Sequence, residues 1–497
     1  MSANGTTRDS TWIGVRMLII LGCLSLLSLG VYLLASQLTY RVGFPLDDAW
    51  IHQTYARNLA RYGEWAFIPG QISGGSTSPL WSVILAAGYL LKLAPFGWTF
   101  LWGWICLTGL AAVAEGTARK LVPEYRTPFP WVGMGFLLEW HLVWSAGSGM
   151  ETLLYAGLIS LVLFSLLAKT ESWRYLGLLV GLAVWVRPDG VTLLGPVLLG
   201  LAMRKPSIPA GLKQLGWFAG GFLLFFAPYL AFNRLIAGAW WPNTFYAKQA
   251  EYASLQQIPL MQRFGNELLL PLVGAGVLLL PGALYFIWNR LHHSPGTVIP
   301  VVLWYLGYVG LYAWRLPVIY QHGRYIQPAM PVFYLLGWVG ALQALYIFNG
   351  RFGWAAKRVW VGALASVLLV FWVLGIHTYS QDVAIIESEM VDTARWVAAN
   401  TSPNSLIAAH DIGALGYFGD RKIVDLAGLI SPDVIHFIRD ESQLKAYLDQ
   451  RNVRFLMTFP DWYPNLVSGV PVVYRSSGRF APAEGQPNMC VYQWGGP

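Results

Sequence analysis

The chain has 497 residues, of which 56% are hydrophobic and 12% are charged, and its formal net charge is +8. Charged residues are about half as frequent as in an average soluble domain, too few to cover a globule of this size. The composition therefore excludes a cytosolic enzyme, a disordered chain and a collagen-like fibre. The three cysteines, Cys23, Cys106 and Cys490, form no CxxC pair, so they predict no disulfide framework and no cysteine-based metal site.

Eleven apolar stretches predict a polytopic, all-α membrane domain, since a span needs about 20 apolar residues. They cover approximately residues 14–36, 97–118, 128–146, 150–168, 172–187, 190–203, 214–236, 268–290, 297–315, 328–347 and 356–378. The stretch 79–94 is shorter and begins at Pro79, which predicts a re-entrant or surface helix within a first outer loop at 37–96. No small-residue cleavage site follows 14–36, so this stretch is predicted to be a retained span.

The charges between these stretches predict the orientation of the chain. With the N-terminus in the cytoplasm, the cytoplasmic pieces are the N-terminal tail, 119–127, 169–171, 204–213, 291–296 and 348–355. These pieces and their flanks hold 14 basic and three acidic residues, against 10 basic and nine acidic residues in the rest of 1–378. The bias follows the positive-inside rule, and it explains the basic character of the chain without a nucleic-acid partner.

Residues 379–497 form a second predicted domain, which lies outside the cytoplasm in this topology. It holds nine basic and 13 acidic residues, against 24 basic and 12 acidic residues in 1–378. The pattern predicts a small α/β domain with helices near 383–399 and 440–452. The expected strands are LIAAHD (406–411), KIVDL (422–426), VRFLMTF (453–459), VPVVY (470–474) and MCVYQW (489–494). The segment GALGYFG (413–419) lacks the dinucleotide-binding spacing and predicts a strand-to-helix turn.

Five polar segments, separated by long apolar stretches, all fall on the predicted outer face. They are FPLDDAWIHQTYARNLARYGEW (44–65), SAGSGMET (145–152), VRPDG (186–190), PNTFYAK (242–248) and QHGRY (321–325). Ionisable groups at membrane depth are costly and usually mark function. Their placement on one side predicts a single extracytoplasmic active site.

The first of these segments carries an acidic pair, Asp47 and Asp48, at the start of an amphipathic helix that ends at Gly63. Adjacent helical residues point about 100° apart, so one carboxylate can face a cavity while the other has a second role. A helix N-cap explains one aspartate but not two. The pair predicts a general base for a substrate hydroxyl, with the other carboxylate orienting the substrate or holding a divalent cation. The sequence leaves open which aspartate is the base.

Cationic residues on the same face predict a phosphate site. Lys248 ends PNTFYAK and Arg324 lies in QHGRY, and two cations near one membrane interface suit a lipid-linked phosphate. For Arg187 a snorkelling membrane anchor is an equal alternative. For Glu151 the alternative is a first-turn carboxylate stabilised by the helix dipole.

The remaining candidate substrate-binding residues are His52, Asn243, His322 and Tyr325. His410 and Asp411 are predicted to form a strand-end turn rather than a proton-transfer pair. The chain has no G-x-S-x-G, H-E-x-x-H or G-x-x-x-x-G-K-[ST] motif, which indicates that the reaction is driven by an activated substrate in the membrane rather than by ATP.

These segments resemble the GT-C superfamily of integral-membrane glycosyltransferases that use polyprenyl-phosphate sugars. DDAWIHQTYARNLARYGEWAFIPGQISGGSTSPLW is similar to the first outer loop of the family. SGMETLLYAGL, VRPDG, PNTFYAK, GRYIQPAMPVF and IGALGYFGDRKIVDLAGLISPDV are similar to its later blocks, in the same order. The resemblance covers nearly the whole chain and is nearest to the branch of the mycobacterial terminal arabinofuranosyltransferases.

The resemblance implies an outer cavity in which a loop aspartate, Asp48 or alternatively Asp47, acts as general base in an inverting transfer. Lys248 and Arg324 match basic positions expected near the donor phosphate, and the outer domain is expected to help bind the acceptor. The implied partners are a polyprenyl-phosphate sugar, membrane lipid and a cell-envelope glycan, lipid or protein. The chain departs from the family pattern at His52 and Thr54, so the sugar and the acceptor stay open. Two other functions also stay open, a glycolipid flippase and a non-catalytic envelope scaffold.

Overall fold

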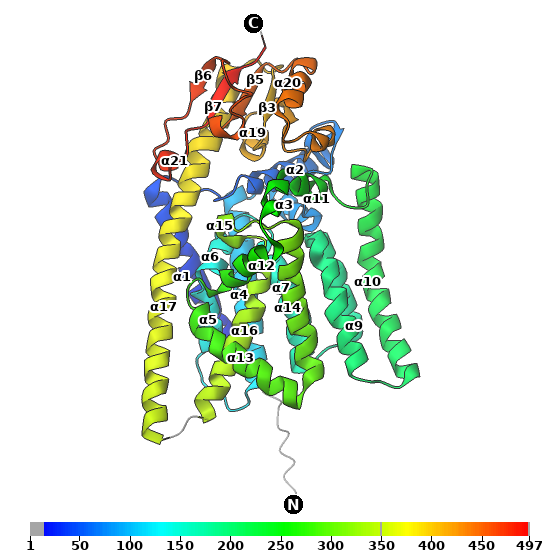
Figure 1. The fold of residues 1–497 in the computed structure, drawn as a ribbon, viewed down its shortest axis with the longest axis vertical. Coiled ribbons are helices and arrows are strands. Elements are labelled where there is room, and N and C mark those ends of the chain that lie inside the picture. The colour runs from blue at the N-terminus through cyan, green and yellow to red at the C-terminus, as the bar shows by residue number, and fades with distance from the viewer. Residues whose placement is uncertain (1–13, 348–349, 496–497) are drawn as a thin grey trace, which may run out of the picture.

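The computed structural model describes residues 14–347 and 350–495. The predicted cytoplasmic tail before residue 14, and residues 348–349 of the last predicted cytoplasmic connection, lie outside the described residues. Helices of the membrane part stand side by side, and a small sheet domain covers one end of them (Figure 1). The connections α9–α10 and α13–α14 lie at the opposite end from this outer domain.

The membrane part is built from helices, most of which overlap the predicted apolar stretches. They are α1 (Val15–Thr39), α2 (Asp48–Tyr62), α3 (Pro79–Leu90), α4 (Pro95–Leu121), α5 (Trp131–Leu137), α6 (Trp140–Gly147), α7 (Thr152–Ala168), α8 (Trp173–Val186), α9 (Leu194–Met203), α10 (Ile208–Ala237), α11 (Asn243–Glu251), α12 (Leu260–Leu269), α13 (Gly276–His293), α14 (Pro295–Arg315), α15 (Tyr320–Gly323), α16 (Met330–Ile347) and α17 (Gly350–Ile385). A short hairpin, β1 (Ala66–Ile68) and β2 (Gln71–Ile72), lies in the first outer loop.

Each of the eleven predicted stretches contains a helix, but not all of these helices have the length of a span. Within the described residues six helices are long and apolar enough to cross a membrane, or seven if the pair Leu260–Leu272 and Gly276–His293, bent by 104°, is one span. The stretch 128–146 divides into α5 and α6, because the Glu139 carboxylate accepts the backbone N–H of Leu142 and starts a new helix there. The number of eleven spans therefore stays a prediction, while the polytopic helical architecture is confirmed.

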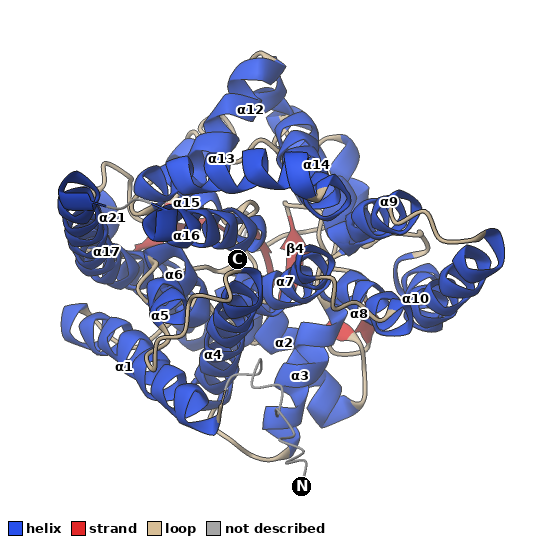
Figure 2. Cartoon of the chain, turned by 90° about the horizontal axis from the view of Figure 1, so that it is seen from below, coloured by secondary structure: helices blue, strands red, loops and turns tan. Residues whose placement is uncertain are grey.

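Seen from below, α8, α9 and α10 lie at one side of the bundle, away from α1 and α17 (Figure 2). Helix α17 is the longest, and it continues through a π-helical turn (Ile386–Val391) into α18 (Asp392–Asn400). A continuous helix thus joins the membrane part to the outer domain.

The outer domain contains a five-stranded sheet in the order β4-β3-β5-β7-β6, with α19 (Gly413–Phe418), α20 (Glu441–Gln450) and α21 (Phe480–Ala483). The strands are β3 (Leu406–Ala409), β4 (Lys422–Asp425), β5 (Phe455–Thr458), β6 (Val472–Arg475) and β7 (Cys490–Gln493). Strand β3 is parallel to β4 and β5, and β7 is antiparallel to β5 and β6. Four of these strands fall within the segments predicted for them, and β6 extends one residue beyond its predicted segment, to Arg475.

The sheet domain and the first outer loop share one hydrophobic core. Trp50 and Tyr55 of α2 are buried together with Ile407 of β3 and Leu415 of α19. Burial of this apolar surface fixes the outer domain on α2, the helix that carries the acidic pair.

Candidate functional site

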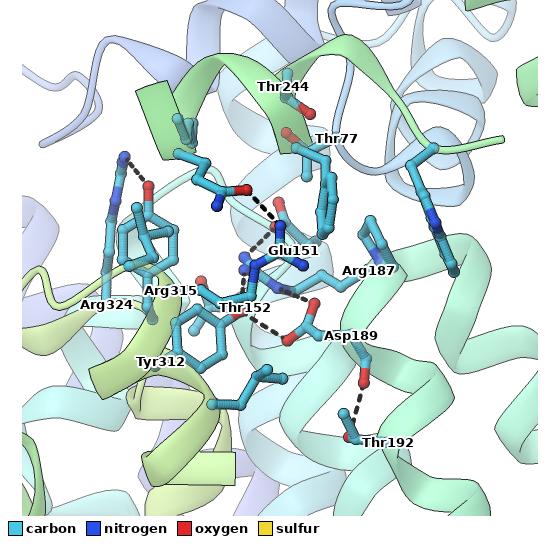
Figure 3. A pocket seen from close by; sticks show the side chains of 18 of the residues that line it. Thr77, Glu151, Thr152, Arg187, Asp189, Thr192, Thr244, Tyr312, Arg315 and Arg324 are labelled. Carbon is cyan, nitrogen blue, oxygen red and sulfur yellow. Dashed lines mark hydrogen bonds and ion pairs between the residues drawn. The ribbon is translucent and has the colours of Figure 1, made fainter. Parts of the chain in front are cut away.

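Two cavities meet where the outer domain covers the membrane helices. The first has a volume of about 420 Å³, and Glu151, Arg187 and Tyr312 are among the residues that line it (Figure 3). Its surface is mainly apolar, and Trp241, Phe245 and Leu311 contribute to it. The second has a volume of about 670 Å³ and is bounded by the outer domain on one side. Three ionisable residues line both cavities: Asp48, Lys248 and Arg324.

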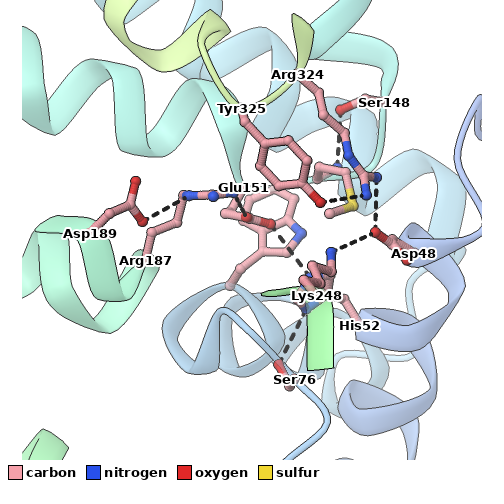
Figure 4. Close-up of polar contacts among 12 residues, drawn as sticks. Asp48, His52, Ser76, Ser148, Glu151, Arg187, Asp189, Lys248, Arg324 and Tyr325 are labelled. Carbon is pink, nitrogen blue, oxygen red and sulfur yellow. Dashed lines mark hydrogen bonds and ion pairs between the residues drawn. The ribbon is translucent and has the colours of Figure 1, made fainter. Parts of the chain in front are cut away.

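These three residues form an ion-pair cluster at the junction of the cavities. The Oδ2 atom of Asp48 lies 2.8 Å from Nη1 of Arg324 and 3.2 Å from Nζ of Lys248 (Figure 4). Burial alone would raise the pKa of Asp48, but the two cations outweigh burial and hold this pKa well below its ordinary value. For Lys248 burial alone would lower the pKa, but Asp48 and Tyr325 outweigh burial and raise this pKa above its ordinary value. The resting site therefore holds an ionised carboxylate between two cations.

Asp47 has a different environment, although it is the adjacent residue. Its carboxylate accepts the backbone N–H groups of Gly413 at 2.6 Å and Ala414 at 2.8 Å, at the N-terminus of α19. Burial raises the pKa of Asp47 to about 6, and these two hydrogen bonds oppose the rise. Asp47 thus caps a helix of the outer domain, not its own helix α2, and it joins the two parts of the chain.

The predicted site residue Arg187 lies in the wall of the first cavity, and each of its three guanidinium nitrogens has a protein partner. Its guanidinium contacts Glu151 Oε1 at 3.1 Å, Asp189 Oδ1 at 3.2 Å and Tyr312 Oη at 2.9 Å. The other oxygen of Asp189 accepts hydrogen bonds from Tyr308 and Tyr312, both at 2.8 Å. This geometry indicates that Arg187 connects α7, α8 and α14, rather than being free to bind a phosphate.

Glu151 and His52 lie next to the ion-pair cluster. His52 Nε2 is 3.5 Å from Glu151 Oε2, and its Nδ1 is 3.1 Å from the Ser82 hydroxyl. Burial lowers the pKa of His52, which favours a neutral ring. Glu151 lines the first cavity, whereas His52 is buried and lines a separate small cavity together with Asp48 and Lys248.

Arg324 follows a turn with unusual backbone geometry. Gln321 (φ 53°), His322 (φ 57°) and Gly323 (φ 65°) are all in the left-handed region, which is costly for the two residues with side chains. The turn is held by His322, whose Nε2 is 2.7 Å from Asp382 Oδ2 on α17. His322 therefore lies in the wall of the second cavity and orients the segment that supplies Arg324.

The remaining two predicted site residues, Tyr325 and Asn243, lie in different surroundings. The Tyr325 hydroxyl accepts a hydrogen bond from Arg324 Nη2 at 2.9 Å, and its ring lies beneath Lys248 with Nζ 5.5 Å from the centroid. Asn243 is turned toward the outer domain, where its Nδ2 donates to the Leu429 carbonyl at 3.3 Å. The structure thus brings Tyr325 into the cluster and places Asn243 at a domain contact.

Sequence reasoning missed several polar residues of both cavities. Asp189 lies within the VRPDG segment but was not singled out, and Tyr308 and Tyr312 were hidden in an apolar stretch, where only their i, i+4 spacing marks a shared helix face. In the second cavity His410 and Asp411 follow β3, as the predicted strand-end turn requires, and His410 contacts Glu251 of α11 at 2.9 Å. Among the described residues, no group of three or more metal-ligating side chains is close enough to hold a metal ion.

Comparison with solved structures identifies the fold. ArnT from Cupriavidus metallidurans bound to undecaprenyl phosphate matches with a TM-score of 0.58 and 14% identity, over 97% of this chain and all of ArnT (100%). The arabinofuranosyltransferase AftD from Mycobacteria matches with a TM-score of 0.51 and 15% identity, over 98% of this chain and 40% of AftD. The chain therefore has the GT-C fold that the sequence resemblance predicts.

Sequence comparisons add one match. Residues 378–492 match a family described as a domain of unknown function, DUF8728. No curated protein sequence matches the chain.

Proposed function

We propose that the chain is a membrane glycosyltransferase that transfers a sugar from a polyprenyl phosphate to a hydroxyl of a cell-envelope glycan, lipid or protein. The observation that carries this proposal is the position of Asp48 between Lys248 and Arg324, at the junction of two cavities. A site for this reaction needs a base on the acceptor side and cations at the leaving phosphate, and the cluster supplies both.

The two cavities suit the two substrates. The first has a mainly apolar surface between residues 187–192, α11 and α14, which fits a prenyl chain. One structurally similar protein, ArnT, is bound to undecaprenyl phosphate, which supports a lipid phosphate of this class. The second cavity is bounded by the outer domain and lies on the other side of Asp48, where an acceptor hydroxyl can reach the carboxylate.

The proposed reaction is a single displacement. Asp48 accepts the proton of the acceptor hydroxyl while the oxygen of that hydroxyl attacks the anomeric carbon of the donor sugar. The bond from that carbon to the phosphate oxygen breaks, and the polyprenyl phosphate leaves with the electron pair from the opposite face. Lys248 and Arg324 stabilise the phosphate charge, and a well-placed donor of this kind supplies about 3 kcal/mol. Attack opposite the leaving group inverts the anomeric centre.

Donor binding has a second effect in this mechanism. In the resting site the two cations depress the basicity of Asp48. A donor phosphate competes for the same cations, and this competition weakens their pairing with the carboxylate. Asp48 then becomes a better base at the stage when the sugar is in place.

The test uses purified protein in lipid nanodiscs with a panel of radiolabelled polyprenyl-phosphate sugars. We expect slow hydrolysis of one donor by water, and its loss in Asp48→Asn. Asp433→Asn, a change at an exposed carboxylate of the outer domain, is the matched control and should leave hydrolysis unchanged. Hydrolysis at the wild-type rate in Asp48→Asn would remove Asp48 as the base, and no hydrolysis of any donor would count against the transferase itself.

A flippase or a scaffold is less well supported by the same geometry. The cationic residues of the cluster gather at one end of the membrane helices, around a carboxylate, whereas a flippase needs sites that open to both ends. A scaffold needs no such buried cluster.

A further inference from the structure

The outer domain contacts α11, the helix that supplies Lys248. His410 follows strand β3 of the outer domain, and its Nε2 lies 2.9 Å from Oε1 of Glu251. Glu251 is the last residue of α11 and stands three positions after Lys248, so the two side chains share one side of the helix. A contact on Glu251 therefore acts directly on the position of Lys248.

His410 is held rigidly by its own domain. Its Nδ1 lies 2.6 Å from the Tyr463 hydroxyl, and the Trp462 ring packs edge-on against it with 4.9 Å between centroids. Burial opposes protonation of His410, but Tyr463 and Glu251 raise its pKa well above the ordinary value. With both nitrogens protonated, the ring donates to Tyr463 on one side and to Glu251 on the other.

Other contacts between the outer domain and α11 converge with this one. The Arg439 guanidinium donates from Nε to the Glu251 carbonyl at 2.8 Å, and Asn243 donates to the Leu429 carbonyl. Ala247, between them, is fully buried in the core that the outer domain shares with α2. A helix of nine residues is marginal by itself, so its position is set by tertiary contacts such as these.

We infer that His410 is a positioning residue for the transfer reaction: through Glu251 it holds α11 where Lys248 reaches Asp48 and the donor phosphate. The inference rests on the proposed function, because Lys248 matters here as a ligand of that phosphate. His410 itself touches no reacting atom, since both its nitrogens are engaged by protein groups. The outer domain is thus part of the donor site, although none of its residues lines the first cavity among the described residues.

The test measures binding of undecaprenyl phosphate to the full chain in nanodiscs. We expect His410→Ala and Glu251→Gln each to weaken binding about tenfold, the lower end of what loss of a supporting partner costs. The double variant should be no weaker than either single variant, because both changes remove one interaction. His410→Lys, which keeps a cation opposite Glu251, should recover part of the affinity. His436→Ala, at an exposed histidine of the same domain, is the matched control.

A second measurement decides the inference without any donor. Amide hydrogen exchange of residues 243–251 should become at least about tenfold faster in His410→Ala and in Glu251→Gln, and should not change in His436→Ala. Unchanged exchange in both variants, or losses of affinity that add in the double variant, would overturn the positioning role. If the wild-type chain does not bind undecaprenyl phosphate, the proposed donor is wrong. Amide hydrogen exchange alone then tests whether His410 and Glu251 fix the position of α11.

Discussion

Two adjacent aspartates have separate surroundings because their side chains point about 100° apart at the start of α2. Asp48 contacts two cations at the junction of the two cavities, whereas Asp47 contacts the N-terminus of α19. The sequence left open which aspartate is the base, and the environment of each carboxylate favours Asp48 for the proposed role. Asp48 lines both cavities, whereas both oxygens of Asp47 accept backbone N–H groups.

The ion-pair cluster predicts opposite effects on turnover and on donor affinity. Asp48→Asn should lower turnover by about 10²–10⁴, the usual contribution of a general base. The same change should tighten binding of undecaprenyl phosphate severalfold, because Lys248 and Arg324 lose their intramolecular partner and become free for the phosphate. Hydrolysis rates and lipid binding in nanodiscs measure the two effects.

The neighbouring residue provides the control for that prediction. Asp47→Asn keeps one acceptor for α19 and leaves the cluster intact, so phosphate binding should stay near the wild-type value. If Asp48→Asn instead weakened phosphate binding, the carboxylate would be holding the cations in place rather than competing for them.

Arg187 is expected to matter for stability more than for phosphate binding. In Arg187→Met the buried carboxylates of Glu151 and Asp189 lose their shared cation, and breaking a buried pair in this way costs about 3–5 kcal/mol. We expect a lower melting temperature in nanodiscs, with bound phosphate restoring little of it. Arg174→Met, at an exposed arginine near the start of α8, the helix that Arg187 follows, is the control. A stable variant that fails only in phosphate binding would make Arg187 a donor ligand.

At the scale of elements, the close approach of α19 to α2 depends on a glycine. A Cβ atom at Gly413 would lie 2.0 Å from the Asp47 carbonyl oxygen and 2.6 Å from its Oδ2. Gly413→Ala should therefore displace the start of α2, and donor hydrolysis should fall about tenfold or more. Gly362→Ala on α17, where a Cβ meets nothing within 4 Å, should leave hydrolysis unchanged. Equal rates in the two variants would show that α2 tolerates the shift.

The contact between His410 and α11 predicts a pH dependence. The folded pKa of His410 lies above its ordinary value of 6.5, with Glu251, Tyr463 and Asp411 as the groups that raise it. Its contribution to stability is therefore full below about pH 6.5 and is lost as the pH rises through the folded pKa. Hydrogen exchange of α11 should quicken toward alkaline pH in the wild type, after correction for intrinsic exchange. His410→Ala should show fast exchange throughout, and a slope equal to that of the wild type would contradict this assignment.

The sequence predicted elements better than it predicted contacts. Apolar runs and short β-rich runs located most of the membrane helices and all five strands of the outer sheet, because burial imposes such patterns locally. The break at Glu139 was missed, since a single capping hydrogen bond decides it. The partner of Asp47 lies 366 residues away in sequence, and no local pattern encodes such a contact.

At the scale of the molecule, the cluster lies at the end that the outer domain covers, and the basic connections predicted to be cytoplasmic include α9–α10 and α13–α14 at the other end (Figure 1). The positive-inside rule applied to those connections predicts that the outer domain is extracytoplasmic. In that orientation the transfer proposed above takes place on the extracytoplasmic side of the membrane, and a lipid-linked donor rather than a nucleotide supplies its energy.

Cysteine labelling tests this orientation. In a background in which Cys23, Cys106 and Cys490 are replaced by alanine, Ser468→Cys places a thiol on the exposed surface of the outer domain. Ser207→Cys places one at the exposed connection between α9 and α10. A membrane-impermeant maleimide added to intact cells or spheroplasts should label Ser468→Cys and should spare Ser207→Cys until the membrane is opened.

The pair of positions controls for reactivity, because both thiols should label equally in detergent. Labelling of Ser207→Cys alone in intact cells would invert the topology and place the ion-pair cluster in the cytoplasm. A cytoplasmic cluster would make a nucleotide-linked donor as plausible as a lipid-linked one. The class of the donor therefore depends on two observations, the orientation of the chain and the apolar surface of the first cavity. The positive charge of the membrane part and the location of the cluster are thus two consequences of one topology.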